Sequence, residues 1–449
     1  MTPVGAPQTR LLPTGRPIAG EIMAGIARLY DEPEWLTSAR REAFAVFERS
    51  ASPSRVTHLW RYTDPAAFEP DGKNALPTPL AGPRAFPSVL AETLETESLA
   101  AGIYVRDGLV WKIAVEDEFI ARGVRIMDLH QAAQEHPELV RQHLGKIVGP
   151  DSGRFEAYVN GAWTGGLLIH VPRGVEITKP VHVVTAQPSG EAQRAGRLLV
   201  LVESGASLTL IDEYGEGTEG GDAPVHTHTV VEMFLGAAAR VKYAPVQNWN
   251  RQTTSYLTQR AHLEADARLE TVLTAVGSQT AKVDCGAVLA GRGAQSNLFG
   301  LAIGDGRQHF DHHTAQHHSA GNTTSDLHFK VALRDRADSI YTGLIRIEDK
   351  AAYCEAYQEN RNLILSPHAK VDTIPELEIL NNEVRCTHAA TVGKIDPQEV
   401  FYLESRGIDP AEAMRLIVTG FVGPILDHLP DVARERLRDA VVRRLEGEA

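Results

Sequence analysis

The chain has 449 residues, of which 43% are apolar, and a formal net charge of −13 at neutral pH. A chain of this length can bury a sizeable core and is expected to form two or three domains. The acidic balance without a clustered basic run argues against a nucleic-acid partner, because phosphate binding needs grouped Lys and Arg.

Composition also indicates the compartment. Three cysteines without the spacing of a disulfide framework indicate reduced thiols in a cytoplasmic protein. The amino terminus lacks an apolar core and no run approaches 18 apolar residues, so neither secretion nor a membrane span is predicted.

Residues 1–150 are predicted to form a mainly helical N-terminal domain. Residues 1–20 are rich in Pro and Gly and are expected to be mobile. Apolar residues then recur at helical spacing over 20–49, and again over 124–148. Residues 65–87 are rich in Pro and Gly and predict a long connector, with or without an ordered structure.

Residues 151–395 are predicted to form a β-rich core. Short β-branched runs alternate with Gly, Asn and Asp, and one pattern recurs, an Ala followed by alternating side chains after a turn. These alanines stand at 206, 239, 267, 294, 337 and 369, so the intervals are 33, 28, 27, 43 and 32 residues. A period near 30 is too short for six βαβ units but suits the coil of a β-solenoid. The long interval is interpreted as an insertion, and an irregular β-sandwich is the alternative.

One pattern in this core favours a different class of protein. His226, His228 and Glu232 follow Gly220 at the spacing of the first cupin metal motif, Gly-x5-His-x-His-x3-Glu. Two histidines on one strand face and a carboxylate suit iron or manganese. The motif's closing glycine is displaced and no second motif supplies a fourth ligand. A cupin-like metal-dependent enzyme is therefore the alternative function.

Histidines and cysteines in the second half of the core are further candidates. Six histidines fall within 20 residues: His309, His312, His313, His317, His318 and His328. Their density favours a metal cage, whereas the lack of a fixed ligand spacing favours polar ladders on the solenoid surface. Cys285 and Cys354 lie in apolar or mixed runs and are expected to be buried, unreactive thiols.

Cys386 and His388 lie two residues apart in β-prone sequence. On a strand they would point the same way, roughly 6.5 to 7 Å apart. A thiolate and an imidazole suit iron, zinc or an iron–sulfur cluster, but four ligands are usual, so others would come from elsewhere, such as a second chain. The alternative is a small buried thiol beside a hydrogen-bonded histidine.

Residues 396–449 are predicted to form a C-terminal helical domain. The segments 396–399 and 409–412 repeat one helix-start pattern, Asp-Pro-x-Glu, in which Asp can cap and Pro fits the first helical position. Between them, Gly407 is expected to end a helix in the left-handed conformation. The two helices carry more apolar surface than they can bury alone, so this face docks a partner or packs on the solenoid.

The segment CTHAATVGKIDPQEVFYLESRGIDPAEAMRLIVTGFV, residues 386–422, closely resembles the C-terminal signature of the SufB/SufD family, subunits of the SUF iron–sulfur cluster assembly complex. The resemblance extends through AYQENRNLILSPHAKVDTIPELEI, residues 356–379, and more weakly back to the segments around Trp35 and Trp60. Within the family, Cys-Thr-His followed by Ala-Ala-Thr-Val-Gly is most similar to SufD, because SufB typically has Cys-Glu-His here.

The resemblance implies a right-handed parallel β-helix flanked by N-terminal and C-terminal helical domains, and a non-enzymatic scaffold role. It implies that the ATPase SufC docks on the C-terminal helices and that SufB pairs with the end of the β-helix. The residues expected to contact SufC are Phe401, Tyr402, Leu416, Ile417 and Phe421. Cys386 and His388 would lie at the SufB interface, with His388 the better candidate for a ligand or cluster-assembly residue.

Cofactors and catalysis follow the same expectation. The isolated chain should hold no cofactor stably, while a cluster or iron would be present transiently in the complex, and a homodimer is an alternative state of the chain when alone. The sequence has neither a Gly-x4-Gly-Lys-Ser/Thr phosphate loop nor a Gly-x-Ser-x-Gly elbow. ATP hydrolysis or serine-hydrolase activity by this chain is therefore not expected.

Overall fold

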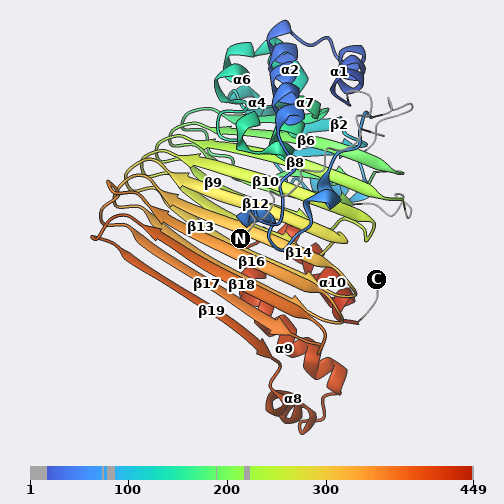
Figure 1. Ribbon diagram of the computed structural model, residues 1–449, viewed down its shortest axis with the longest axis vertical. Helices are drawn as coiled ribbons and strands as arrows, with labels where there is room; N and C mark the ends of the chain where they lie inside the picture. The colour runs from blue at the N-terminus through green and yellow to red at the C-terminus, as the bar shows by residue number, and fades with distance from the viewer. Residues whose placement is uncertain (1–17, 73–74, 78–85, 189, 217–222, 447–449) are drawn as a thin grey trace, which may run out of the picture.

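The computed structural model describes residues 18–72, 75–77, 86–188, 190–216 and 223–446. Its centre is a parallel β-solenoid in which two sheets face each other, with helices above one end and along one side (Figure 1). The solenoid prediction is thus confirmed and the β-sandwich alternative is wrong. Residues 1–17, which were expected to be mobile, lie outside the described part of the chain.

Successive strands alternate between the two sheets. Among the described residues, the first sheet has the order β19-β17-β15-β13-β11-β9-β7-β5-β1-β2, and the second has the order β18-β16-β14-β12-β10-β8-β6-β4-β3. The strands of the first sheet are β1 (Ala101–Arg106), β2 (Leu109–Val115), β5 (Val181–Ala186), β7 (Ser207–Glu216), β9 (Arg240–Gln247), β11 (Arg268–Ala275), β13 (Gln295–Gly304), β15 (Thr324–Leu333), β17 (Glu355–Ile364) and β19 (Arg385–Lys394). The strands of the second are β3 (Arg125–Asp128), β4 (Gly165–Val171), β6 (Ala192–Val202), β8 (Val225–Leu235), β10 (Thr253–Leu263), β12 (Thr280–Leu289), β14 (His309–His318), β16 (Asp338–Ile347) and β18 (Lys370–Ile379).

The recurring alanines mark the corners of the coils. Gly205, Ala238, Asp266 and Gly293 have positive φ, between 58° and 78°, and each directly precedes one of these alanines. The left-handed residue turns the chain inward, so the next side chain enters the corner, where only a small one fits. The alanines at 206, 239, 267, 294 and 337 are accordingly at most 1% exposed.

The interpretation of the 43-residue interval as an insertion is wrong. Thr280 of β12 pairs with His309 of β14, and His309 pairs with Asp338 of β16, so each coil here adds 29 residues. Ala294 precedes a strand of the first sheet, whereas Ala337 precedes a strand of the second. The interval therefore spans one and a half coils, and the histidine-rich stretch is an ordinary strand.

The N-terminal segment combines helices with strands. Its helices are α1 (Ile18–Leu29), α2 (Glu34–Arg49), η1 (His58–Trp60), η2 (Pro65–Phe68), α3 (Ser88–Glu95), α4 (Asp117–Ala121), α5 (Leu129–Glu135), α6 (Pro137–His143), η3 (Pro150–Ser152) and α7 (Arg154–Ala162). The helical prediction for 20–49 is confirmed. The one for 124–148 is wrong at its start, because Ile126 belongs to β3 and packs in the solenoid core. Within the proposed connector 65–87, η2 is ordered and Phe68 is 1% exposed, whereas 73–74 and 78–85 are outside the described residues.

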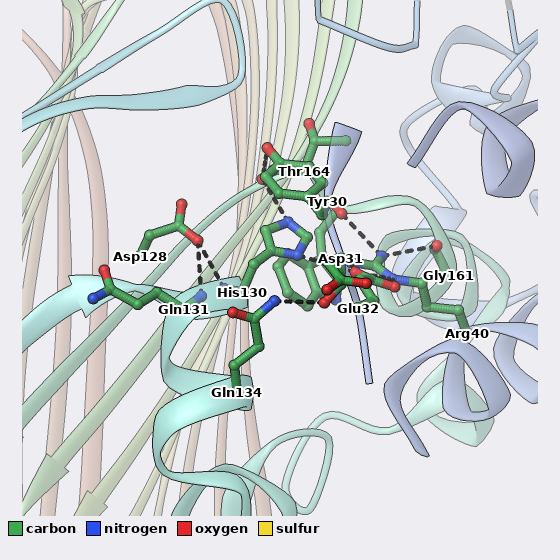
Figure 2. A network of polar contacts seen from close by, with 11 residues as sticks. Tyr30, Asp31, Glu32, Arg40, Asp128, His130, Gln131, Gln134, Gly161 and Thr164 are labelled. Carbon is green, nitrogen blue, oxygen red and sulfur yellow. Dashed lines mark hydrogen bonds and ion pairs between the residues drawn. The ribbon is translucent and has the colours of Figure 1, made fainter. Parts of the chain in front are cut away.

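A buried polar network joins the N-terminal helices to the solenoid (Figure 2). Arg40 of α2 donates to both carboxylate oxygens of Glu32 and to the carbonyl oxygens of Gly161 and Trp163. His130 of α5 lies 3.0 Å from Glu32 through Nδ1 and contacts the carbonyl oxygen of Thr164 through Nε2. The network thus ties the α1–α2 turn to the residues that lead from α7 into β4.

The chain ends in α8 (Pro397–Glu404), α9 (Pro410–Leu426) and α10 (Asp431–Glu446). Asp396 and Asp409 accept hydrogen bonds from the amides of Gln398 and Ala411, and Gly407 has φ +85°, so the predicted caps and helix end are confirmed. Apolar side chains of α9 and α10 pack with the outward side chains of the first sheet. Figure 1 shows these helices behind the strands, with α8 beyond the last coil.

Candidate site at the open end of the solenoid

The last coil, formed by β18 and β19, ends both sheets. Each of the two strands pairs with one described neighbour only, β16 and β17 respectively. Their outer edges therefore present backbone N–H and C=O groups that no further strand satisfies, and such edges invite pairing with another chain. Figure 1 shows this end at the bottom of the solenoid, away from the N-terminal helices.

Cys386 and His388 lie on the inward face of β19. They pair with Ala356 and Gln358 of β17, which are 5% and 1% exposed inside the solenoid. Gln358 reaches across the interior and donates to the carbonyl oxygen of Gly343 at 3.3 Å. Because side chains stacked along a parallel ladder share a face, Cys386 and His388 point into the space that another coil would close. The strand prediction and the shared face are confirmed.

The two side chains differ in environment. Cys386 is half-buried against a small apolar cluster that includes Ile345 and Ala356, and this burial raises the pKa of its thiol. The thiol is therefore protonated at neutral pH in the isolated chain, and binding a metal would have to displace its proton. His388 is exposed at the mouth of the coil and can receive a ligand without rearrangement.

Apolar side chains surround this mouth. Four of them are exposed on or beside the last two strands: Leu377 (37%), Ile379 (38%), Leu380 (58%) and Val392 (47%). Leu377 and Ile379 pair with Ile345 and Ile347, which are fully buried one coil earlier. The inward positions of Leu377 and Ile379 are thus buried in the preceding coil, and in the last coil nothing in the described chain covers them.

A second exposed apolar surface lies on the C-terminal helices. Phe401 and Tyr402 of α8 and Leu416 of α9 are 69%, 57% and 43% exposed. Ile417 and Phe421 are half-buried. Lys330 of β15 donates to the carbonyl oxygen of Phe421 at 2.7 Å and lies 5.1 Å from its ring centroid, so Phe421 faces the solenoid at least in part.

The cupin-type hypothesis is wrong. Cupins are antiparallel jelly rolls, whereas β8 pairs in parallel on both sides. Glu232 is fully buried and binds Arg197 together with the backbone amides of Gly145, Ile147 and Val148. Both oxygens of this carboxylate accept structural hydrogen bonds, so the carboxylate is not available to a metal.

His226 and His228 do lie on the same face of β8 as Glu232, but they form no ligand set with it. Phe68, Phe155 and Tyr256 surround His228, and burial lowers the pKa of this histidine to about 3. Throughout the described residues, no group of three or more His, Cys, Asp or Glu side chains is arranged to hold a metal ion.

Side chains of the histidine-rich strand β14 alternate between the inside and the outside of the solenoid. His312 and His318 point inward and are fully buried, and burial lowers their pKa to about 3 and about 4. The outward-facing histidines pair with carboxylates: His309 with Asp338, His313 with Asp311, His317 with Glu348, and His328 of β15 with Asp326. The four outward histidines fit the alternative of polar ladders on the solenoid surface, whereas His312 and His318 lie inside the solenoid, and the six do not converge.

The two other cysteines are buried in the solenoid. Cys285 donates to Gln259 at 2.8 Å, and burial raises the pKa of its thiol to about 12. Cys354 is 0% exposed and contacts Thr323. Both fit the expectation of unreactive thiols.

Sequence reasoning missed one buried charged group. Lys282 of β12 is 1% exposed, pairs with Asp311 of β14 at 2.8 Å and donates to the carbonyl oxygen of Leu59 at 2.6 Å. Thr63 directs its hydroxyl at Asp311 and also contacts His309 at 2.8 Å. A lysine and an aspartate within apolar strands were the signal that could have indicated this group.

Comparisons with known proteins give the family of the chain. Residues 183–421 match the family model described as SUF system FeS cluster assembly, SufBD core domain, and residues 29–183 match the SufBD protein N-terminal region. The iron–sulfur cluster assembly protein SufB of Bacillus subtilis is 27% identical over 428 residues, covering 92% of this chain and 90% of the relative. A SufBD family protein of Staphylococcus haemolyticus gives the same identity and coverage. Within the described helices, none is long and apolar enough to cross a membrane.

Proposed function

The chain belongs to the SufBD family of the SUF iron–sulfur cluster assembly system, and on that premise we propose that it is a non-catalytic scaffold subunit of the D type. The choice between the types rests on the sequence, because the relatives carry the names SufB and SufBD. Cys386-Thr387-His388 has threonine where SufB-type chains typically have glutamate. A scaffold role is consistent with the missing phosphate loop.

The observation that carries the proposal is the open last coil. A SufB-type chain that adds its own edge strands to β18 and β19 would complete both sheets at once. It would pair the backbone groups of both edges and cover the exposed apolar residues at the mouth. In the absence of that partner, a second copy of this chain would use the same surface and form a homodimer.

Such pairing would place Cys386 and His388 in the seam between two chains. They supply one thiol and one imidazole, two of the four ligands that iron in a cluster normally takes. The partner would supply the others, as a thiolate or a carboxylate. A site divided between chains would form only in the complex, so the isolated chain would release a cluster or iron rather than hold it.

The exposed face of α8 and the start of α9 is the proposed SufC-docking surface. Phe401, Tyr402 and Leu416 are exposed, whereas Val418 and Val422 of α9 are fully buried against the solenoid. One face of α9 thus packs on the solenoid, and the other face is available to a partner. Ile417 and Phe421 would lie at the border of this surface.

The test is co-expression of this chain with SufB-type and SufC-type partners, followed by size determination and by iron and sulfide analysis. His388→Ala should lower cluster content while leaving the composition of the complex and its melting temperature unchanged. His262→Ala, at a surface histidine of β10, is the matched control. Normal iron and sulfide in the His388→Ala, Cys386→Ala and double variants would leave both residues structural and move the site to the partner.

A further inference from the structure

The N-terminal segment 54–72, called the strap below, crosses the outer face of the second sheet. Its backbone amide at Gly72 binds Gln193 of β6, and at the other extreme His58 lies 2.8 Å from Glu376 of β18. Figure 1 shows this blue segment in front of the strands of the second sheet. The strap therefore reaches from the N-terminal module to the edge strand of the open end.

The strap is held in place along its length. Trp60 packs with Phe68, Phe155 and Tyr256 at ring-centroid distances of 4.8 to 5.7 Å. The Lys282 ammonium lies 4.7 Å from the centroid of the Trp60 ring. Together with the contacts of Leu59 and Thr63 to Lys282, His309 and Asp311, these interactions make the strap a fixed part of the molecular surface.

The end of the strap next to β18 leaves apolar side chains exposed. Val56, Leu59 and Tyr62 are 94%, 37% and 38% exposed, although the neighbouring Trp60 and Thr63 are buried. His58 contacts Glu376 on the outer face of β18, whereas Leu377, the next residue, points to the inner face of the same strand, so the strap borders the edge strand that carries the exposed apolar residues of the last coil. Apolar side chains gathered in this way on a soluble chain mark an interaction surface.

We propose that Val56, Leu59 and Tyr62 form one flank of the surface on which the second SufBD-type chain docks. This inference rests on the proposed function, since it extends the interface across β18 and β19. Strands added to a sheet lie about 4.8 Å apart. If a partner chain extends the second sheet beyond β18, the residues that cover the outer face of the partner's sheet would therefore lie next to the strap. The partner would then contact the two edge strands and the strap together.

The test compares three variants that carry charged substitutions at exposed apolar positions. The strap variant is Val56→Asp with Leu59→Asp, the mouth variant is Val392→Lys, and the control is Ile120→Asp on α4, where Ile120 is 55% exposed. The Kd of the complex with a SufB-type partner is measured by sedimentation. We expect the strap variant to weaken the complex at least tenfold, the mouth variant to do the same, and the control to change it less than twofold.

The outcomes separate the two proposals. A strap variant that binds like the control while Val392→Lys abolishes association would overturn the strap inference and leave the proposed end-to-end pairing intact. Normal binding by both variants would overturn both. Amide hydrogen exchange of wild-type residues 54–62 needs no substitution: it should slow when the partner binds, and unchanged exchange would contradict the strap inference even if the strap variant failed to fold.

Discussion

Arg40→Ala tests how the N-terminal helices are fixed to the solenoid. Arg40 is 1% exposed and donates to Glu32 from Nε at 3.0 Å and from Nη2 at 2.7 Å. It also donates to the carbonyl oxygens of Gly161 and Trp163 at 3.0 and 2.9 Å. The adjacent Arg41 on the same helix is 62% exposed in its side chain and approaches Glu34 only to 3.9 Å. Arg41→Ala is therefore the matched control.

The magnitude follows from what the substitution leaves behind. Without Arg40, the Glu32 carboxylate, 4% exposed, loses its ion pair and keeps the contact with His130, and two buried carbonyl oxygens lose a donor. Breaking a buried ion pair by removing one partner costs about 3 to 5 kcal/mol. An exposed arginine contributes less than about 1 kcal/mol. Since about 1.4 kcal/mol is a factor of ten, the two variants should differ by roughly 30-fold or more in the unfolding equilibrium constant.

The assay is urea unfolding at pH 7 followed by tryptophan fluorescence, because the Arg40 guanidinium lies 4.0 Å from the centroid of the Trp163 ring. The Arg40→Ala transition should fall to a lower urea concentration, while Arg41→Ala should match wild type. Equal midpoints for the two variants would refute the reasoning, since the network would then contribute no more than a surface pair.

Acidification gives an independent check on the same network. Burial opposes ionisation of Glu32, but the hydrogen bonds from His130 and Arg40 outweigh burial and lower the pKa of its carboxyl. A carboxyl with a lowered folded-state pKa contributes stability above its unfolded pKa of about 4.3, and this contribution is lost as the pH falls through the folded value. Glu32→Gln should therefore weaken the protein at pH 7 and make its stability less dependent on pH below about 4.

Four further outcomes are expected. The isolated chain should bind no ATP in equilibrium dialysis, because it has no phosphate loop, and stoichiometric binding would contradict this. Phe401→Ala with Leu416→Ala should weaken SufC association, since each buried side chain contributes about 1.5 to 3 kcal/mol, and a lowered melting temperature with normal binding would instead make both residues core. His388→Ala should reduce iron and sulfide incorporation more than Cys386→Ala does, because the imidazole is exposed and the thiol is half-buried. Ala238→Gly should stabilise the chain by about 1 kcal/mol in urea unfolding, because Ala238 has φ +58° and glycine removes the left-handed strain.

Local patterns predicted the parts of the structure that local physics determines. The period of the corner alanines indicated the solenoid, because at several turns a left-handed residue is followed directly by a buried alanine. Alternation placed Cys386 and His388 on one face, because side chains on a strand alternate by geometry alone. The Asp-Pro starts at 396 and 409 were predicted because a cap involves only the neighbouring amides.

Contacts between distant residues decided what the sequence could not. The spacing of His226, His228 and Glu232 is that of a metal motif. However, Arg197, 35 residues before Glu232, donates a hydrogen bond to the Glu232 carboxylate. No alanine marks the corner before β14 or β15. The next alanine of the pattern therefore precedes a strand of the second sheet, and the sequence alone gave no sign of this change of sheet. Leu59 and Thr63 of the strap contact residues more than 200 positions away, and the sequence around them carries no local sign of that path.

The two ends of the solenoid differ in a way that bears on function. Terminal repeats of a solenoid normally need a cap that covers the inward residues. At the first coil, β2 and β3 pair antiparallel with their neighbours, and the N-terminal helices pack around α7 and β4. After the last coil the chain continues through three helices, yet α9 and α10 pack on the side of the first sheet rather than over β18 and β19. The chain has enough helix to cap this end and places it elsewhere. Leu377, Ile379 and Val392 stay apolar at this uncovered end, and exposed apolar groups favour a partner, so we infer that the surface holding His388 is completed by a second chain.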